Sequence, residues 1–87
     1  MENIFIIILK ALKGDLKEII YGRIIFRCQL SYASLYRRLK DGFKPHELDS
    51  VRSILSKYSH QINSLGLPQE HYNQFTKIIQ ESNEITN

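Results

Sequence analysis

The sequence predicts an all-α fold of about five short helices packed around one core. Three observations lead to this expectation. Apolar residues recur every three or four positions along most of the chain. Glycine and proline at Gly14, 42–45 and 66–68 divide the chain into helix-sized pieces. The 87 residues, of which 43% are hydrophobic, suit one globular domain, so we expect residues 1–87 to form a single helical unit.

The first predicted helix covers residues 3–13. One face of this helix carries five apolar residues, namely Ile4, Ile7, Ile8, Ala11 and Leu12. The same apolar run also fits a buried strand, but the chain offers no second strand to pair with it, and a lone strand is not stable. A helix lying on a membrane surface is the other alternative, although the segment lacks the basic face that such helices carry.

The second predicted helix opens with the sequence DLKE, in which Asp15 and Glu18 have the spacing of a capping box, and it runs to about Cys28. Gly22 inside this helix costs roughly 1 kcal/mol relative to alanine, which leaves room for a break or a close contact there. The third helix is capped by Ser31 and stops at Gly42, with Leu35 and Leu39 facing inward.

Two further helices follow the sequence FKP. The fourth is expected over about residues 46–64, along a stripe that contains Leu48, Val51, Ile54, Leu55, Tyr58, Ile62 and Leu65. The fifth begins near Pro68 and covers about residues 68–82, after which a polar tail is expected to fray. Its apolar face comprises Tyr72, Phe75, Ile78 and Ile79. This face either forms a homodimer surface or closes the core of the monomer.

Positive charge is concentrated in one segment. Residues 23–44 hold six basic residues against one acidic residue, whereas the rest of the chain holds six basic against eight acidic. A local surplus of this kind suits a polyanionic partner, although a solvated helix face gives the same pattern.

The second and third helices are joined by about three residues, 29–31, which is the length of a helix-turn-helix connection. The segment IIFRCQLSYASLYRRLKDG resembles the helix-turn-helix of bacterial repressors. Its LSYASLYRR core is similar to the lac repressor family. The glycine, proline and amphipathic helix that follow are similar to the Xre (lambda-repressor-like) family. The resemblance covers about residues 20–58 and places the motif at about residues 20–42.

The resemblance implies a role for each matching position. Tyr32, Ala33 and Arg37 correspond to base-facing positions, and Ser31, Ser34 and Tyr36 correspond to phosphate-facing ones. Leu35 and Leu39 correspond to core anchors, and Cys28 and Leu30 to packed positions around the turn. Two residues depart from the pattern: Ile25 is large where a small residue is usual, and Gln29 replaces a glycine that adopts the left-handed conformation.

The chemistry of these side chains fits duplex DNA. The guanidinium of Arg37 can bond both major-groove acceptors of guanine, and Arg27, Arg38, Lys40 and Lys44 could neutralise phosphates. The expected function is therefore a sequence-specific DNA-binding regulator of bacterial or phage type, acting as a homodimer. The alternative is a helical protein-interaction module, such as an adaptor, inhibitor or antitoxin-like partner, whose patch is Tyr32, Tyr36 and Phe43.

Other classes of function lack a sequence signature. The three histidines are 14 and 11 residues apart and Cys28 is the single cysteine, so we expect no metal site, no cofactor and no enzyme activity. The apolar run at the N-terminus is too short for a signal peptide or a membrane span. A single cysteine fits a reducing compartment, and we therefore expect a cytoplasmic protein.

Overall fold

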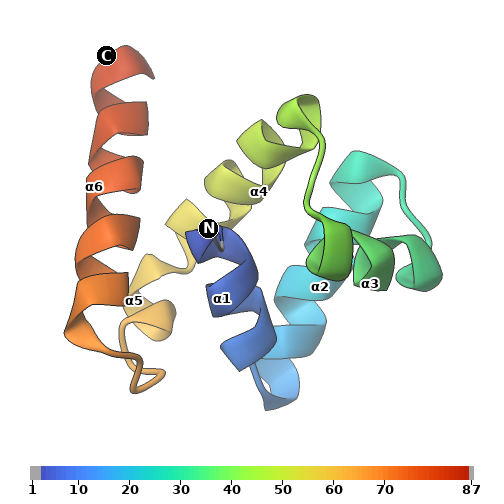
Figure 1. The fold of residues 1–87 in the computed structure, drawn as a ribbon, viewed down its shortest axis with the longest axis horizontal. Coiled ribbons are helices and arrows are strands. Elements are labelled where there is room, and N and C mark those ends of the chain that lie inside the picture. Colours follow the sequence, from blue (N-terminus) through green and yellow to red (C-terminus); the bar gives the residue numbers. More distant parts are fainter. Residues whose placement is uncertain (1–2, 87) are drawn as a thin grey trace.

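The computed structural model describes the backbone of residues 3–86 and the side chains of residues 3–80. Within this range the fold is all-α, as predicted, and contains six helices and no strand. The helices are α1 (Ile4–Ala11), α2 (Gly14–Cys28), α3 (Tyr32–Asp41), α4 (Pro45–Lys57), α5 (Ser59–Ile62) and α6 (Gln69–Thr86). Helix α1 lies between α6 and the pair formed by α2 and α3 (Figure 1).

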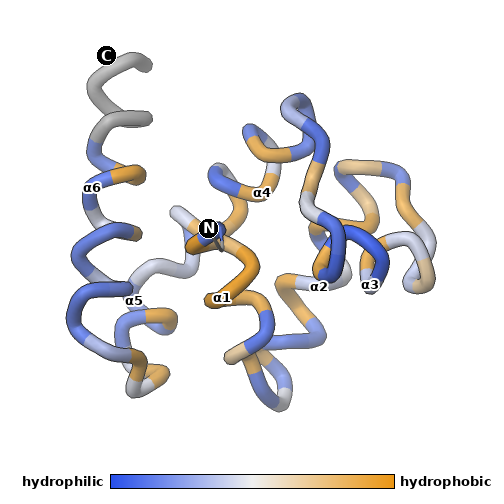
Figure 2. The backbone as a smooth tube through the Cα atoms, in the orientation of Figure 1, coloured by the Kyte–Doolittle hydropathy of each residue, from blue (hydrophilic) through white to orange (hydrophobic). Residues whose placement is uncertain are grey.

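Helix α1 is the most apolar element of the core (Figure 2). Its first turn is closed by Asn3, whose side-chain oxygen accepts a hydrogen bond of 2.7 Å from the N–H of Phe5. The segment is thus a helix and not a strand. The buried surface of α1 is wider than the single apolar face that was predicted, because Phe5 and Leu9 are also buried. Ile7 and Ala11, which were assigned to that face, are only half-buried. A helix enclosed by neighbours on several sides has no need of a polar face.

Helix α2 spans nearly the predicted range, but its start differs from the prediction. The helix begins at Gly14 after the extended residue Lys13, and no side chain caps it. In the described residues no backbone N–H donates a hydrogen bond to the side chain of Asp15, so the predicted capping box at Asp15 and Glu18 was wrong. The positive φ of Gly14, 61°, lets the chain turn directly from α1 into α2 without a side-chain cap.

The predicted fourth helix is two helices. Helix α4 ends at Lys57, and the short α5 starts at Ser59, after a turn at Tyr58 with φ −111° and ψ 20°. The sequence around this turn is Ser56–Lys57–Tyr58–Ser59–His60, in which four of the five residues are mediocre helix formers. The apolar stripe nevertheless continues across the turn, since Ile54, Leu55 and Ile62 are all buried.

Helix α6 begins at Gln69, directly after Pro68, and continues to Thr86, past the predicted end near residue 82. Phe75 anchors α6 to the core with 1% of its surface exposed. Tyr72 is half-buried, and its hydroxyl oxygen accepts a hydrogen bond of 2.8 Å from the N–H of Leu67. Ile78 and Ile79 pack partly against the same core. Phe75 therefore closes the monomer's core, which is the second of the two roles considered for this face.

Candidate nucleic-acid interface

The connection between α2 and α3 has the predicted length of three residues, Gln29 to Ser31. Gln29 adopts the left-handed conformation, with φ 55° and ψ 47°. The N–H of Leu30 then bonds the carbonyl of Ile25 at 3.0 Å, which closes α2 with the backbone pattern of a Schellman motif. The conformation expected of Gln29 at the turn is thus confirmed, and the turn redirects the chain sharply into α3.

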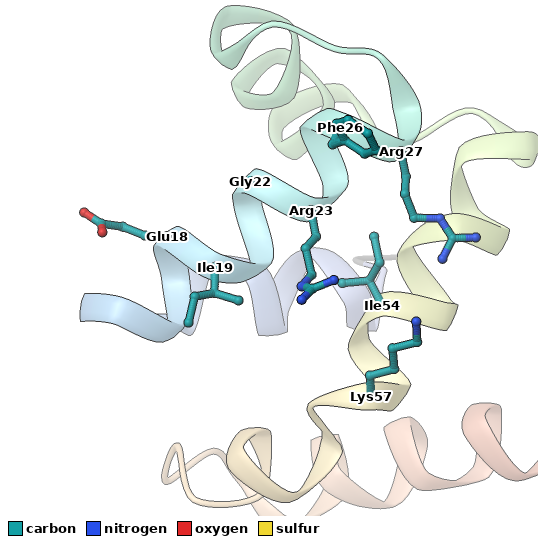
Figure 3. A pocket seen from close by; sticks show the side chains of 8 residues that line it. All are labelled: Glu18, Ile19, Gly22, Arg23, Phe26, Arg27, Ile54 and Lys57. Carbon is teal, nitrogen blue, oxygen red and sulfur yellow. The ribbon is translucent and has the colours of Figure 1, made fainter.

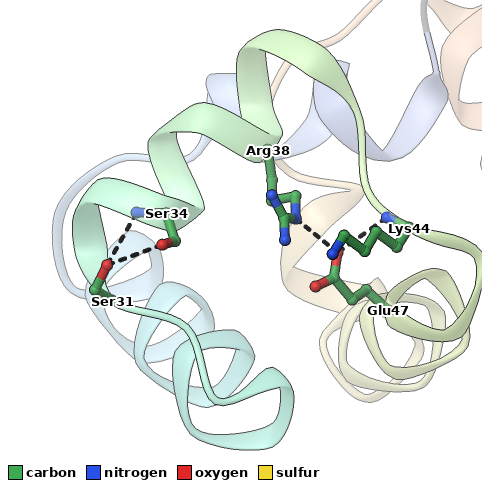
Figure 4. Close-up of polar contacts among 5 residues, drawn as sticks. All are labelled: Ser31, Ser34, Arg38, Lys44 and Glu47. Atoms are coloured by element: carbon green, nitrogen blue, oxygen red, sulfur yellow. Dashed lines mark hydrogen bonds and ion pairs between the residues drawn. The ribbon is translucent and has the colours of Figure 1, made fainter.

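Ser31 caps the N-terminus of α3, as predicted. Its hydroxyl oxygen accepts a hydrogen bond of 3.1 Å from the N–H of Ser34 and lies 3.0 Å from the Ser34 hydroxyl (Figure 4). Ser31 is exposed and Ser34 is half-buried. Both hydroxyls therefore hold the first turn of α3 in place, at the end of the helix that leads into the major groove in the helix-turn-helix mode.

Helix α3 has sharply different inner and outer faces. Leu35 and Leu39 face inward and are 0% and 6% exposed, as expected for core anchors. The outer face carries the exposed residues Tyr32, Ala33, Tyr36, Arg37 and Lys40, with Tyr32 and Tyr36 58% and 51% exposed. Lys44, in the loop before α4, is also exposed. The candidate base-facing side chains thus lie on one accessible side of α3.

Arg38 differs from the other candidate DNA-contacting residues because it turns toward the protein. Its Nε donates a 2.8 Å hydrogen bond to Oε1 of Glu47, and its side chain is only 18% exposed (Figure 4). The same carboxylate oxygen accepts a bond of 2.9 Å from the N–H of Lys44. Arg38 therefore fastens α3 to the first turn of α4, and the adjacent carboxylate of Glu47 offsets its positive charge.

Glu47 was not singled out from the sequence, yet it holds this junction together. It is 3% exposed. Burial works to raise the pKa of Glu47, but the hydrogen bonds from Arg38 and from the Lys44 N–H outweigh it and set the pKa below its ordinary value. The sequence signal was its position in the first turn of α4, two residues after Pro45, where a glutamate commonly accepts a bond from the capping residue.

Two tyrosines of the outer face are partly held by α2. The ring of Tyr36 meets the ring of Tyr21 edge-on, with 6.3 Å between centroids and 75° between planes. Tyr21 donates a 2.7 Å hydrogen bond to the carbonyl of Leu9, and burial, followed by the nearby Tyr36, raises the pKa of Tyr21. A groove of about 370 Å³ between α2 and α3 is lined by Gly14, Lys17, Glu18, Tyr21, Tyr32 and Tyr36. Tyr36 is thus held in part by its contact with Tyr21, and both Tyr32 and Tyr36 remain more than half exposed.

The two packed positions at the end of α2 are both half-buried. Ile25 and Cys28 pack in part against the core, so the fold accommodates the large side chain of Ile25. Burial, and next the negative charge of Glu47, raise the pKa of the Cys28 thiol. A raised pKa is the opposite of what activates a cysteine as a nucleophile.

The basic surplus of residues 23–44 divides between two surfaces. Arg37, Lys40 and Lys44 lie on the outer side of α3 and the loop after it. Arg23 and Arg27 instead line a second groove, between α2 and α4 (Figure 3). The sequence alone could not separate these surfaces, since all five cations fall within one short segment.

Among residues 3–80, no three His, Cys, Asp or Glu side chains come together in a group that could hold a metal ion. In the part of the chain that the structure describes, no helix has both the length and the apolar character needed to cross a membrane. Neither the family models, nor the curated proteins, nor the solved structures compared with the chain include a match to it.

Proposed function

We propose that the protein is a small DNA-binding regulator of bacterial or phage type, in which α3 enters the major groove of a duplex. The observation that carries this proposal is the outer face of α3, where Tyr32, Ala33 and Arg37 are exposed at and after a serine-capped N-terminus. Base readout belongs to the side chains at this end of a recognition helix. Lys40 and Lys44 lie beside this face and supply contacts to phosphate.

In this proposal the protein acts in the cytoplasm. It acts there as a homodimer, because a single ten-residue recognition helix reads few base pairs. The dimer surface on α6 is the exposed part of Tyr72, Ile78 and Ile79, since Phe75 is occupied by the core. Arg38 contributes indirectly, by fixing α3 against α4 through Glu47.

The test is fluorescence anisotropy with labelled genomic fragments at two ionic strengths. Affinity is expected to fall steeply as salt rises, because phosphate contacts release counterions. Arg37→Ala is expected to cost about 1–3 kcal/mol on the preferred fragment and to relax sequence preference. Lys44→Ala is expected to weaken the binding of all fragments alike. It is also expected to reduce the slope of log affinity against log salt concentration by about one. Lys77→Ala, an exposed lysine on α6, is the matched control and leaves binding unchanged.

A second candidate is a protein-interaction module that uses the same face. It is favoured by the exposed tyrosines Tyr32 and Tyr36 and by the groove beside them. Phe43, the third member of the expected patch, is half-buried against the core and offers less surface. The same experiment separates the candidates: absence of binding to any fragment at low ionic strength excludes the DNA-binding proposal and leaves the interaction module.

A further inference from the structure

The outward side of α2 carries two large apolar residues that the domain does not cover. Phe26 is 84% exposed and Ile19 is 46% exposed. They are seven positions apart, so they lie on the same side of the helix about two turns apart, and Gly22 lies between them. Two large apolar side chains exposed on one side of a helix give more apolar surface than a single one, and such surface is typical of contact sites.

This side of α2 borders the second groove, which runs between α2 and α4 (Figure 3). The groove has a volume of about 490 Å³. Ile54, which is 1% exposed, forms its floor, and Ile19 and Phe26 line the α2 side. The cations Arg23, Arg27 and Lys57 and the single acid Glu18 complete its lining.

Gly22 has no role inside the domain that would require a glycine. Its φ is not positive, and α2 continues through it without a break. A Cβ added at this position would meet nothing within 4 Å. Glycine in a helix interior costs about 1 kcal/mol relative to alanine, so the fold alone would be more stable with a side chain here. The absence of a side chain at Gly22 leaves the middle of the groove open to close approach by another backbone.

The charge around the groove is not compensated within the described residues. Between the described residues, ion pairs join Arg38 to Glu47 and Arg52 to Asp49, and His71 lies 3.9 Å from Glu70. None of these contacts involves a cation of the groove. The guanidinium of Arg23 lies 5.8 Å from the ring centre of Tyr58, and the other two cations of the groove are Arg27 from α2 and Lys57 from α4. Three cations against one acid select an acidic partner.

The charges and the exposed apolar residues of the groove each argue against one other occupant. A second copy of the chain seated face to face would bring the same cations together across the two-fold axis. A nucleic acid would satisfy the cations but would leave Phe26 and Ile19 facing phosphates and water. An amphipathic helix with both apolar and acidic side chains matches the whole surface.

We propose that the groove between α2 and α4 docks an acidic amphipathic helix of another protein. The apolar side chains of that helix pack on Ile19, Phe26 and Ile54, and its carboxylates pair with Arg27 and Lys57. Its backbone passes close to α2 at Gly22. This inference is independent of the DNA-binding proposal, because it uses another face and another class of partner.

The experiment is a selection from a random peptide library displayed on phage, with the immobilised full chain as target and no DNA present. Peptides that are enriched are expected to carry leucine or aromatic residues at helical spacing, with aspartate or glutamate beside them. Their synthetic versions are then titrated against variants. Gly22→Leu, which places a side chain in the groove, and Phe26→Ala are expected to weaken binding about ten-fold or more.

Controls separate loss of the groove from loss of the fold. Gly22→Leu is expected to keep or raise the thermal midpoint, because leucine is a better helix former and the added side chain has open space. Arg37→Ala, on the other face, is expected to leave peptide binding unchanged. Arg27→Glu is expected to weaken the binding of the acidic peptides and to reduce the dependence of their affinity on salt.

Four outcomes would overturn the proposal. The first is a selection that enriches no peptide over a bare surface, and the second is that the enriched peptides are basic. The third is that the enriched peptides bind the Gly22→Leu variant with the same affinity as the unmodified chain. The fourth is that the chain associates with itself and that Gly22→Leu abolishes this association. The last result would assign the groove to a second copy. Failure of DNA binding changes none of these measurements, so the two proposals stand or fall separately.

Discussion

At the scale of single residues, the ion pair between Arg38 and Glu47 fixes α3 against the first turn of α4. A cluster of cations in the sequence indicates a charged surface, but which cation turns inward depends on a carboxylate from the next helix. Glu47 supplies that carboxylate from the first turn of α4. Arg38 is therefore half-buried in an ion pair within the protein, whereas Arg37, its neighbour in the sequence, is exposed.

Replacing Glu47 with glutamine should reduce stability in a pH-dependent way. The pKa of Glu47 in the folded protein lies below its ordinary value of 4.5, so its ionised form stabilises the fold above pH 4.5. That contribution is lost as the pH falls through the lower, folded-state pKa. Urea unfolding followed by circular dichroism should show Glu47→Gln less stable by about 1–3 kcal/mol at pH 7, with the difference narrowing below pH 4.5.

Asp49→Asn is the matched control for this experiment. The carboxylate of Asp49 is 81% exposed and lies 3.5 Å from Arg52, so its loss should change stability by less than about 0.5 kcal/mol. A Glu47→Gln difference that stayed constant from neutral to acid pH would show that charge at this position does not hold the junction.

At the scale of elements, the order of helices and the turn between α2 and α3 were predictable because their signals are local. The cap at Ser31 and the stop at Gly42 follow from which residues the backbone needs at helix ends. The left-handed conformation of Gln29 was expected from the resemblance to a helix-turn-helix, because glutamine itself does not favour it. The break at Tyr58 was not predictable from the apolar stripe, which continues through it. The capping box at Asp15 failed because Gly14 makes the turn without a side-chain cap.

Gln29→Gly tests the turn as the joint between the two elements. A left-handed backbone costs a residue with a side chain about 1–2 kcal/mol, and glycine avoids that cost at the expense of a more flexible unfolded chain. We expect a net gain of about 0.5–1 kcal/mol in the free energy of unfolding by urea denaturation. Gln61→Gly, at an exposed position of α5 where φ is not positive, should instead destabilise the protein. A loss of stability in Gln29→Gly would mean that the glutamine side chain itself supports the turn.

At the scale of the whole molecule, α6 is the element whose role the sequence left open. A helix with one apolar stripe can close its own monomer or join two, and the stripe looks the same in both cases. The structure places Phe75 in the core with 1% of its surface exposed, and α6 contacts α1. The core is therefore completed from the far end of the chain, by a helix that follows all the others.

Phe75→Ala should reveal this arrangement through its dependence on protein concentration. Removing a buried phenylalanine costs about 3–5 kcal/mol, which is a large share of the roughly 5–15 kcal/mol that holds a small domain together. Because Phe75 packs within one chain, the loss should be the same when unfolding is measured at low and at high protein concentration. If Phe75 instead held two chains together, the unfolding midpoint of the unmodified protein would rise with concentration and that of Phe75→Ala would not. Thermal unfolding over a hundred-fold range of concentration, with the exposed Lys77→Ala as control, decides between the two.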